Sequence, residues 1–262
     1  MSRVGILLIA ALVSVTARAG IAPESPTTQV KTASPGSSYR ATLLIRNAGS
    51  APADVKIYQT DYAFAADGSA LYVTPGSMPR SNAPWVHLGQ EQISIAPGEL
   101  GRIDYEVRVP QDERLTGTYW STLMVEQVGG VEASGEQRSR MQLRQTLRHA
   151  IQVITEIGAT GKGEIAFRNA RVLTEAGKRE LSVDLENTGE RWLQTQLWLE
   201  LHDATGHSAG KFTGQRRRTF PATSARHRID LTSVPPGKYV ALLVADGGRN
   251  DLFGTQIELD LR

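Results

Sequence analysis

Histidines are the first residues to test for chemistry, because an imidazole can bind a metal or move a proton near neutral pH. The chain has five histidines and no cysteine. His202 and His207 flank Asp203 in a predicted hairpin turn, which is the arrangement nearest to a metal site. Solvent-exposed turn residues explain it better, since no histidine has a spacing to carboxylates that is typical of metal ligands. The five are His87, His149, His202, His207 and His227.

The motifs for a catalytic nucleophile and for phosphate binding are also absent or incomplete. Serines lie in predicted turns, and the sequence has no Gly-x-Ser-x-Gly elbow. The stretch GATGKG at 158–163 resembles a phosphate loop but lacks the full spacing, the Ser or Thr after lysine and a following helix. Asp67-Gly68 and Asp246-Gly247 could contact calcium, yet Asp-Gly is the ordinary hairpin signal. We therefore expect no catalytic residue, no metal site and no cofactor, and a protein that is not an enzyme.

Two groups of arginines could face an anionic partner. Arg216–Arg218 lies close in sequence to Arg226 and Arg228. Solvated strand ends are the ordinary explanation of such a group. The second group lies on the polar side of one predicted strand and the loop before it, where outward-facing charge is also usual: Arg138, Arg140, Arg144 and Arg148.

That strand, Met141–Val153, is the element around which the chain is organised. Its odd positions are mostly apolar and its even positions mostly polar or basic. A period of two is typical of a half-buried β-strand. We interpret it as the last strand of a first domain. At a sheet edge, such a strand can pair with a strand of another protein.

The rest of the chain repeats one all-β pattern. Predicted strands follow every ten residues or so and are divided by Gly, Pro and Asn turns, as in β-sandwiches. Asn47 and Gly49 recur as Asn187 and Gly189, and Gly-x-Tyr recurs at 117–119 and 237–239. The sequence thus predicts two related immunoglobulin-like β-sandwiches, over residues 20–157 and 158–262. The two tyrosines of Gly-x-Tyr are expected to hydrogen-bond to nearby backbone at a corner; they are Tyr119 and Tyr239.

The first 19 residues have the pattern of a secretory signal peptide. Arg3 precedes an apolar run, and Ala17-Arg18-Ala19 fits the cleavage rule. Removal of this segment leaves 27 basic and 27 acidic residues. A net charge of zero and export both argue against a nucleic-acid partner. We expect no membrane span in the mature chain, and the sequence carries no indication of oligomeric state.

These features resemble the PapD-like periplasmic pilus chaperones. In that family the chaperone lends an alternating strand to an unfinished pilus subunit, and basic residues anchor the subunit's C-terminus. The resemblance implies a partner-binding row at Leu143, Leu147 and Ile151, with Met141 beside it. It also implies Arg148 as the basic anchor, with only Lys31 available for the family's second anchor in the first strand.

A second resemblance covers more of the chain. The series SPGSSYRATLLIRNAGS, IAPGELGRIDYEVRVPQD, GTYW, ELSVDLENTGE, FPATS and PPGKYVALL is similar to the WxL-interacting surface proteins, which also have two immunoglobulin-like domains. Both resemblances imply binding of other proteins outside the cytoplasm. We expect a periplasmic chaperone that binds exported subunits of a pilus or surface structure by strand addition. The alternative is a structural or adhesive cell-envelope protein that binds other surface proteins or the cell wall.

Overall fold

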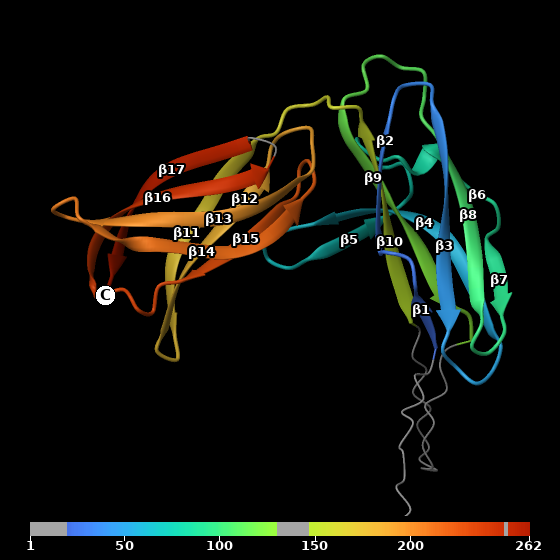
Figure 1. The fold of residues 1–262 in the computed structure, drawn as a ribbon, viewed down its shortest axis with the longest axis horizontal. Coiled ribbons are helices and arrows are strands. Elements are labelled where there is room, and N and C mark those ends of the chain that lie inside the picture. The colour runs from blue at the N-terminus through green and yellow to red at the C-terminus, as the bar shows by residue number, and fades with distance from the viewer. Residues whose placement is uncertain (1–19, 130–146, 249–250) are drawn as a thin grey trace, which may run out of the picture.

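The chain folds into two β-sandwiches joined at a bend (Figure 1). The computed structural model describes residues 20–129, 147–248 and 251–262. Apart from one short 3-10 helix, every regular element of the described residues is a strand. The architecture is the predicted one, two immunoglobulin-like sandwiches in tandem, whereas the predicted signal peptide lies outside the described residues.

The first sandwich packs a four-stranded sheet, in the order β1-β3-β8-β6, against a larger sheet in the order β2-β10-β9-β4-β5. Strand β7 pairs with the start of β4. The elements are β1 Ile21–Pro23, β2 Thr28–Ala33, β3 Ser38–Asn47, β4 Ala53–Phe64, β5 Ala70–Val73, η1 Ala83–Trp85, β6 Val86–Leu88, β7 Gln92–Ile95, β8 Leu100–Arg108, β9 Gly117–Gln127 and β10 Arg148–Ile157.

The second sandwich packs the sheet β11-β12-β15 against the sheet β14-β13-β16-β17. Its strands are β11 Ile165–Glu175, β12 Lys178–Asn187, β13 Leu193–Asp203, β14 Ser208–Thr219, β15 Ser224–Asp230, β16 Gly237–Gly248 and β17 Asp251–Leu261. The chain crosses from one pair of sheets to the other between β10 and β11. The predicted boundary after Ile157 falls at the first residue of this connection.

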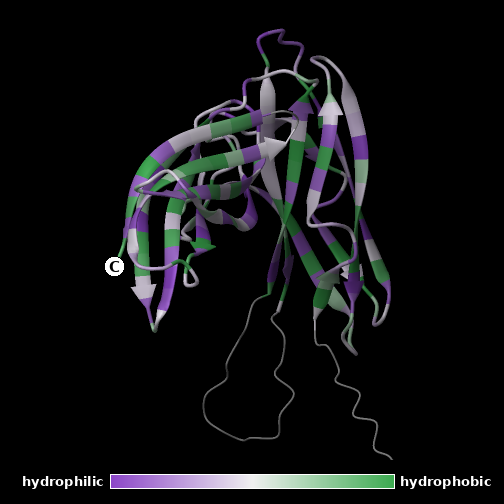
Figure 2. Cartoon of the chain, turned by 60° about the vertical axis from the view of Figure 1, so that its left-hand side comes forward, coloured by the Kyte–Doolittle hydropathy of each residue, from purple (hydrophilic) through white to green (hydrophobic). Residues whose placement is uncertain are grey.

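Alternation along the strands builds both cores. Apolar and polar residues succeed one another along most strands (Figure 2), and the apolar ones turn into the space between the two sheets. In β10 the odd positions Ile151, Val153 and Ile157 lie in the first core, as the period of two predicts. In the structure β10 begins at Arg148, and residues 141–146 of the predicted strand lie outside the described residues.

The sequence repeat corresponds to a repeated corner. The buried side chain of Asn47 donates to the carbonyls of Ala51 and Ile95 and accepts from the Gly49 amide. In the second sandwich Asn187 makes the equivalent three bonds. Each asparagine therefore holds the turn after its strand against the neighbouring chain, which explains why the same residue types recur.

Only one of the two Gly-x-Tyr tyrosines makes the predicted corner bond. Tyr239 donates its hydroxyl to the Pro235 carbonyl at 3.0 Å, which is the predicted corner bond. Tyr119 makes no such bond within the described part of the chain. Its ring packs against Trp85 at 4.7 Å between centroids, and the Arg80 guanidinium lies over it at 5.4 Å. The second prediction was therefore wrong, because aromatic packing occupies Tyr119 instead.

Candidate functional site: a strand edge and a domain junction

Strand β10 is only partly covered by its neighbours. It pairs along its whole length with β9 in antiparallel register. On the other side β2 pairs with it in parallel, but only from Gln152 to Ile157. Strand β2 begins at Thr28, opposite Gln152, and Pro26, which has no amide hydrogen, precedes it nearby. Residues 148–151 therefore pair with β9 alone among the described residues.

Backbone groups point out of this uncovered edge. The Gln152 amide donates toward β2, to the Thr27 carbonyl at 2.9 Å, while the Leu147 carbonyl accepts from Gln127 on the β9 side. Since the two sides alternate along a strand, the amide and carbonyl of Arg148 and Ala150 face the uncovered edge. This edge offers a ladder of donors and acceptors to an added strand.

The predicted partner-binding residues fall in different places. Leu147 is half-buried directly before β10. Arg148 is 56% exposed and pairs with Glu126 at 2.8 Å. Ile151 is 0% exposed and belongs to the first core, so it supports the strand and presents no surface. Met141 and Leu143 lie outside the described residues.

The two predicted anchor residues lie apart. Lys31 stands opposite Thr155 in the β2–β10 register, seven positions along the strand from Arg148. At about 3.3 Å per residue this separates them by roughly 23 Å. Arg148 also has a partner already, since the Glu126 carboxylate accepts from both Arg148 and the Tyr58 hydroxyl. Burial is the larger cause that raises the pKa of Tyr58, and the hydrogen bond of its hydroxyl to Glu126 raises it further.

The even face of β10 forms the junction between the domains. Ile154 packs with Trp120 of β9 and with Phe220 of the second domain in a small apolar cluster. The Trp120 indole donates to the Tyr62 carbonyl at 2.7 Å. Glu156 accepts a bond from the Trp192 indole at 3.0 Å. The sequence predicts an outward, polar face as far as Gln152; beyond it, Ile154 and Glu156 are covered by the second domain.

Close backbone contact completes the junction. The Thr118 amide donates to the Glu190 carbonyl at 2.9 Å, and the Trp192 amide donates to the Thr118 hydroxyl. Gly117 has φ +70, and a Cβ there would lie 2.2 Å from the Glu190 oxygen. Only glycine fits this conformation and this approach, so the glycine of the first Gly-x-Tyr belongs to the junction.

One arginine crosses the junction to the β2–β10 seam. Arg218 of β14 donates to the Thr28 hydroxyl at 3.0 Å and to the Gln152 side-chain oxygen at 3.2 Å. Its guanidinium also lies 4.9 Å from the centre of the Trp192 ring. Burial lowers the pKa of Arg218, because its charge is partly removed from water. The three-arginine run of β14 is therefore not uniformly a solvated strand end.

The histidines show no metal-binding arrangement. The described part of the chain contains no group of three or more His, Cys, Asp or Glu side chains placed to hold a metal. His207 takes part in the turn that Asp203 organises through bonds to backbone amides. His227 is buried, and its Nε2 lies 3.2 Å from the Thr195 hydroxyl. Nor does any helix in the described ranges have the length and apolarity needed to cross a membrane.

Solved structures share this fold at low sequence identity. A chain of a chaperone–tip adhesin complex of CFA/I fimbriae aligns with TM-score 0.50 and 10% identity, over 92% of this chain and 98% of the other. The class 5 fimbrial chaperone CfaA gives 0.48 and 9%, over 91% and 98%. The CsuC–CsuE chaperone–tip subunit complex of Acinetobacter baumannii gives 0.45 and 13%, over 92% and 98%.

No protein-family model matches the chain, and no curated protein matches it significantly. At 10% identity the likeness to the CFA/I chain shows the fold alone. That fold, two immunoglobulin-like sandwiches joined at a bend, resembles the PapD-like pilus chaperones.

Proposed function

We propose that this protein is a periplasmic chaperone that binds exported subunits of a pilus or surface structure by strand addition. The partner's strand lies along the uncovered edge of β10, and the protein acts by binding, without catalysis. The observation that carries the proposal is the edge itself. Among the described residues, strand β10 is paired on both sides from Gln152 onward and on one side only before it.

Main-chain bonds at such an edge supply affinity, and alternate side chains supply specificity. The outward amide and carbonyl groups of Arg148 and Ala150 pair with the partner's backbone. Leu147 extends the row toward Leu143 and Met141, and these apolar side chains fill a groove in the subunit. Ile151 holds the strand in the core rather than contacting the partner.

Arg148 contacts the subunit by exchanging its ion partner. Its guanidinium is more than half exposed and is held by one carboxylate, Glu126. An exposed pair of this kind contributes little to stability, so a partner carboxylate can replace Glu126 at low cost. Lys31 takes no part, since it stands opposite Thr155.

Two further points, which do not concern the β10 edge, support this proposal. The predicted signal peptide implies export, and the fold is shared with a chain of a chaperone–tip adhesin complex. The structural or adhesive envelope protein, as in the WxL-interacting proteins, is the competing hypothesis. It uses other faces and loops and leaves the β10 edge without a role.

A capture experiment separates the two. The tagged mature protein is recovered from its native periplasm as the wild type, Leu147→Asp and Leu252→Asp, and bound proteins are identified by mass spectrometry. Leu252 is a matched control, because it is a leucine that is 66% exposed on β17 of the other domain. The proposal predicts one exported subunit at a ratio of about one to one, retained by Leu252→Asp and lost by Leu147→Asp.

Circular dichroism of the purified variants completes the test. Leu147→Asp should keep the wild-type spectrum and melting temperature, since Leu147 lies before the strand. Recovery of envelope components, or of the same subunit with both variants, would refute strand addition at this edge.

A further inference from the structure

Strand β17 forms a free edge of the second sandwich (Figure 1). Among the described residues it pairs only with β16, and the register of this pairing is unbroken from Leu252 to Leu261. The strand is eleven residues long and contains no Lys, Arg or Pro. Natural sheets protect an edge by keeping it short or by a bulge, a proline or a basic side chain. From Leu252 onward β17 has none of these protections.

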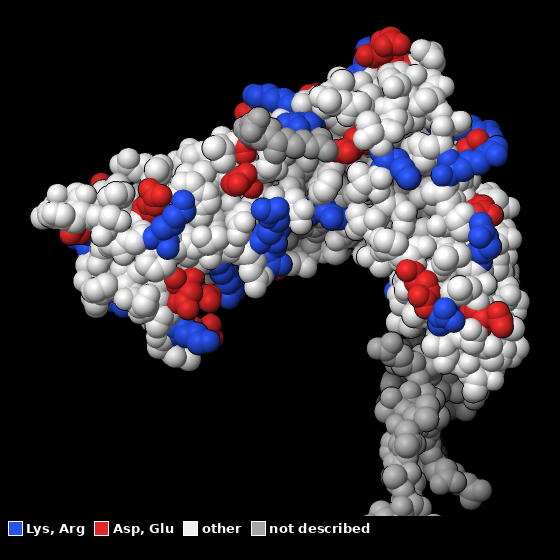
Figure 3. Space-filling model, in the orientation of Figure 1, with Lys and Arg blue, Asp and Glu red and all other residues white. Residues whose placement is uncertain are grey.

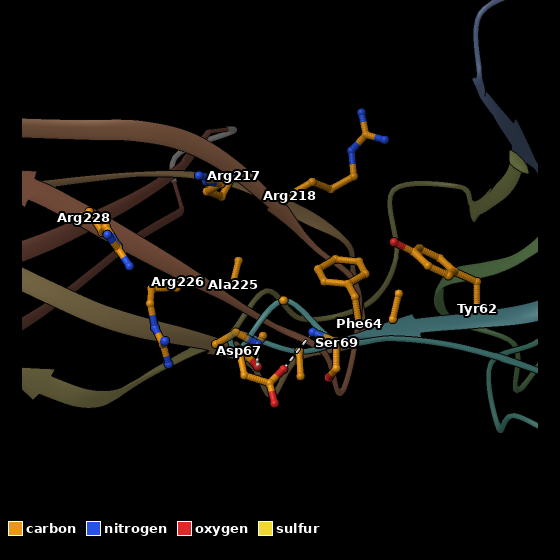
Figure 4. Close-up of a pocket in the computed structure, with 14 residues that line it drawn as sticks. Tyr62, Phe64, Asp67, Ser69, Arg217, Arg218, Ala225, Arg226 and Arg228 are labelled. Carbon is orange, nitrogen blue, oxygen red and sulfur yellow. Dashed lines mark hydrogen bonds between the residues drawn. The ribbon is translucent and has the colours of Figure 1, made fainter. Parts of the chain in front are cut away.

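The other edges of the described sheets are protected. Strands β1, β5, β6 and β7 have three or four residues each, and β2 is short and carries Lys31. Register shifts interrupt β11 once and β14 twice. Basic side chains gather where the second domain faces the first (Figure 3). Figure 4 shows four of them, on β14 and β15, around the cavity beside the hairpin β4–β5: Arg217, Arg218, Arg226 and Arg228.

Apolar side chains are incompletely covered along the β17 edge. Leu252 is 66% exposed, and Phe253 and Ile257 are half-buried at the rim of the second core. On the adjacent strand β16, Leu242 is 40% exposed opposite Gln256. A strand added beside β17 would cover part of this apolar surface and would bond to the free amides and carbonyls of the edge.

The sequence of β17 is complementary to itself in antiparallel register. When Gln256 lies opposite Gln256 of a second copy, all eleven residues of the two strands overlap. On the outward face Glu258 then lies opposite Gly254, and Asp260 lies opposite Leu252, so no two like charges meet. On the core-facing side the same register pairs Asp251 with Leu261, Phe253 with Leu259 and Thr255 with Ile257.

We propose that β17 pairs with β17 of a second copy of this chain, in antiparallel register about Gln256. The pairing joins the β14-β13-β16-β17 sheets of the two copies into one continuous sheet. The site lies in the second domain, and it does not depend on strand addition at β10.

Sedimentation velocity of the mature protein over a concentration series tests this pairing. Gln256→Lys and Gln256→Glu each place two like charges opposite each other at the twofold axis, and Gln256 is exposed, so the fold should tolerate both. The decisive sample is an equimolar mixture of the two variants, in which a lysine meets a glutamate. The matched control is Gln215→Lys, because Gln215 is an exposed glutamine on β14, the opposite edge of the same sheet.

The wild type should sediment as a dimer that dissociates on dilution. Gln256→Lys and Gln256→Glu alone should each raise the dissociation constant at least about tenfold, and their mixture should form dimers again. Recovery in the mixture would also show that both variants are folded. Gln215→Lys and Leu147→Asp should behave as the wild type, so a failure of strand addition at β10 would leave these results unchanged.

Several results would overturn the assignment. They include a wild type that is monomeric at every concentration, a dimer unaffected by both changes at Gln256, and a mixture that stays monomeric. Equal weakening by Gln215→Lys would indicate general surface charge, and weakening by Leu147→Asp alone would place the contact at the β10 edge. A monomer whose β17 amides are protected from hydrogen exchange by its captured subunit would assign this edge to a different protein.

Discussion

Phe220 of the second domain stacks on Trp120 of the first, with ring centroids 4.8 Å apart and ring planes inclined by 14°. Phe64 meets the same Phe220 ring edge-on at 6.0 Å. The side chain of Phe220 is thus anchored in the first domain although its backbone belongs to the second. This contact fixes how the two sandwiches lie relative to each other.

Replacement of Phe220 by alanine should therefore uncouple the domains. Phe220 is completely buried, and Phe-to-Ala changes at such sites cost about 3–5 kcal/mol. We expect a single calorimetric transition in the wild type and two separated transitions in Phe220→Ala. Phe220→Leu keeps much of the apolar volume and should melt close to the wild type. One unchanged transition in Phe220→Ala would contradict a coupling role.

The repeated corner predicts matched losses in the two domains. Asn47→Ala and Asn187→Ala each remove bonds to two carbonyls and one amide. Unsatisfied buried groups cost about 1–3 kcal/mol each, partly offset where water enters. Urea unfolding should show a loss of at least about 2 kcal/mol for either variant. A loss in only one of the two would show that the corners are not equivalent.

His227 should make the second domain sensitive to acid. Burial, and then the charge of Arg217, lower the pKa of His227 from 6.5 to about 4. The unfolded chain therefore binds a proton at higher pH than the folded chain does. Stability is fully present above pH 6.5 and falls as the pH drops toward 4, by a total of about 3 kcal/mol.

The change from pH 7.5 to pH 4.5 measures this effect. The melting temperature of the wild type should fall by several degrees more than that of His227→Leu, which cannot take up the proton. Thr195 keeps a second acceptor in the variant, the Arg217 carbonyl at 3.4 Å. An equal fall in both proteins would place the acid sensitivity elsewhere.

Local patterns were sufficient for the fold. The period of two in β10 correctly places Ile151 and Val153 in the core, and the spacing of Asn47 and Asn187 reveals the repeat. These features depend on residues close together in sequence, which is why they are readable without a structure.

Long-range contacts were not predictable in the same way. The parallel pairing of Thr28 with Gln152 joins residues far apart in the chain and decides which part of β10 is free. The contact of Phe220 with Ile154 and Trp120 likewise depends on how the domains lie together. Trp192, directly before β13, and Phe220, directly after β14, are large aromatic residues at strand ends, and they were the available signal that the junction is apolar. For the arginine group, only the structure separates Arg226, which is paired with Asp184, from Arg217.

Strand addition, as proposed above, places a partner strand along β10 before Gln152. Hydrogen–deuterium exchange of the protein alone and in complex with its captured subunit measures this pairing at the backbone amides. We expect the peptide covering residues 147–151 to gain protection on binding, because the outward amides of Arg148 and Ala150 become hydrogen-bonded. Unchanged exchange in this peptide, with protection confined to other strands, would contradict it.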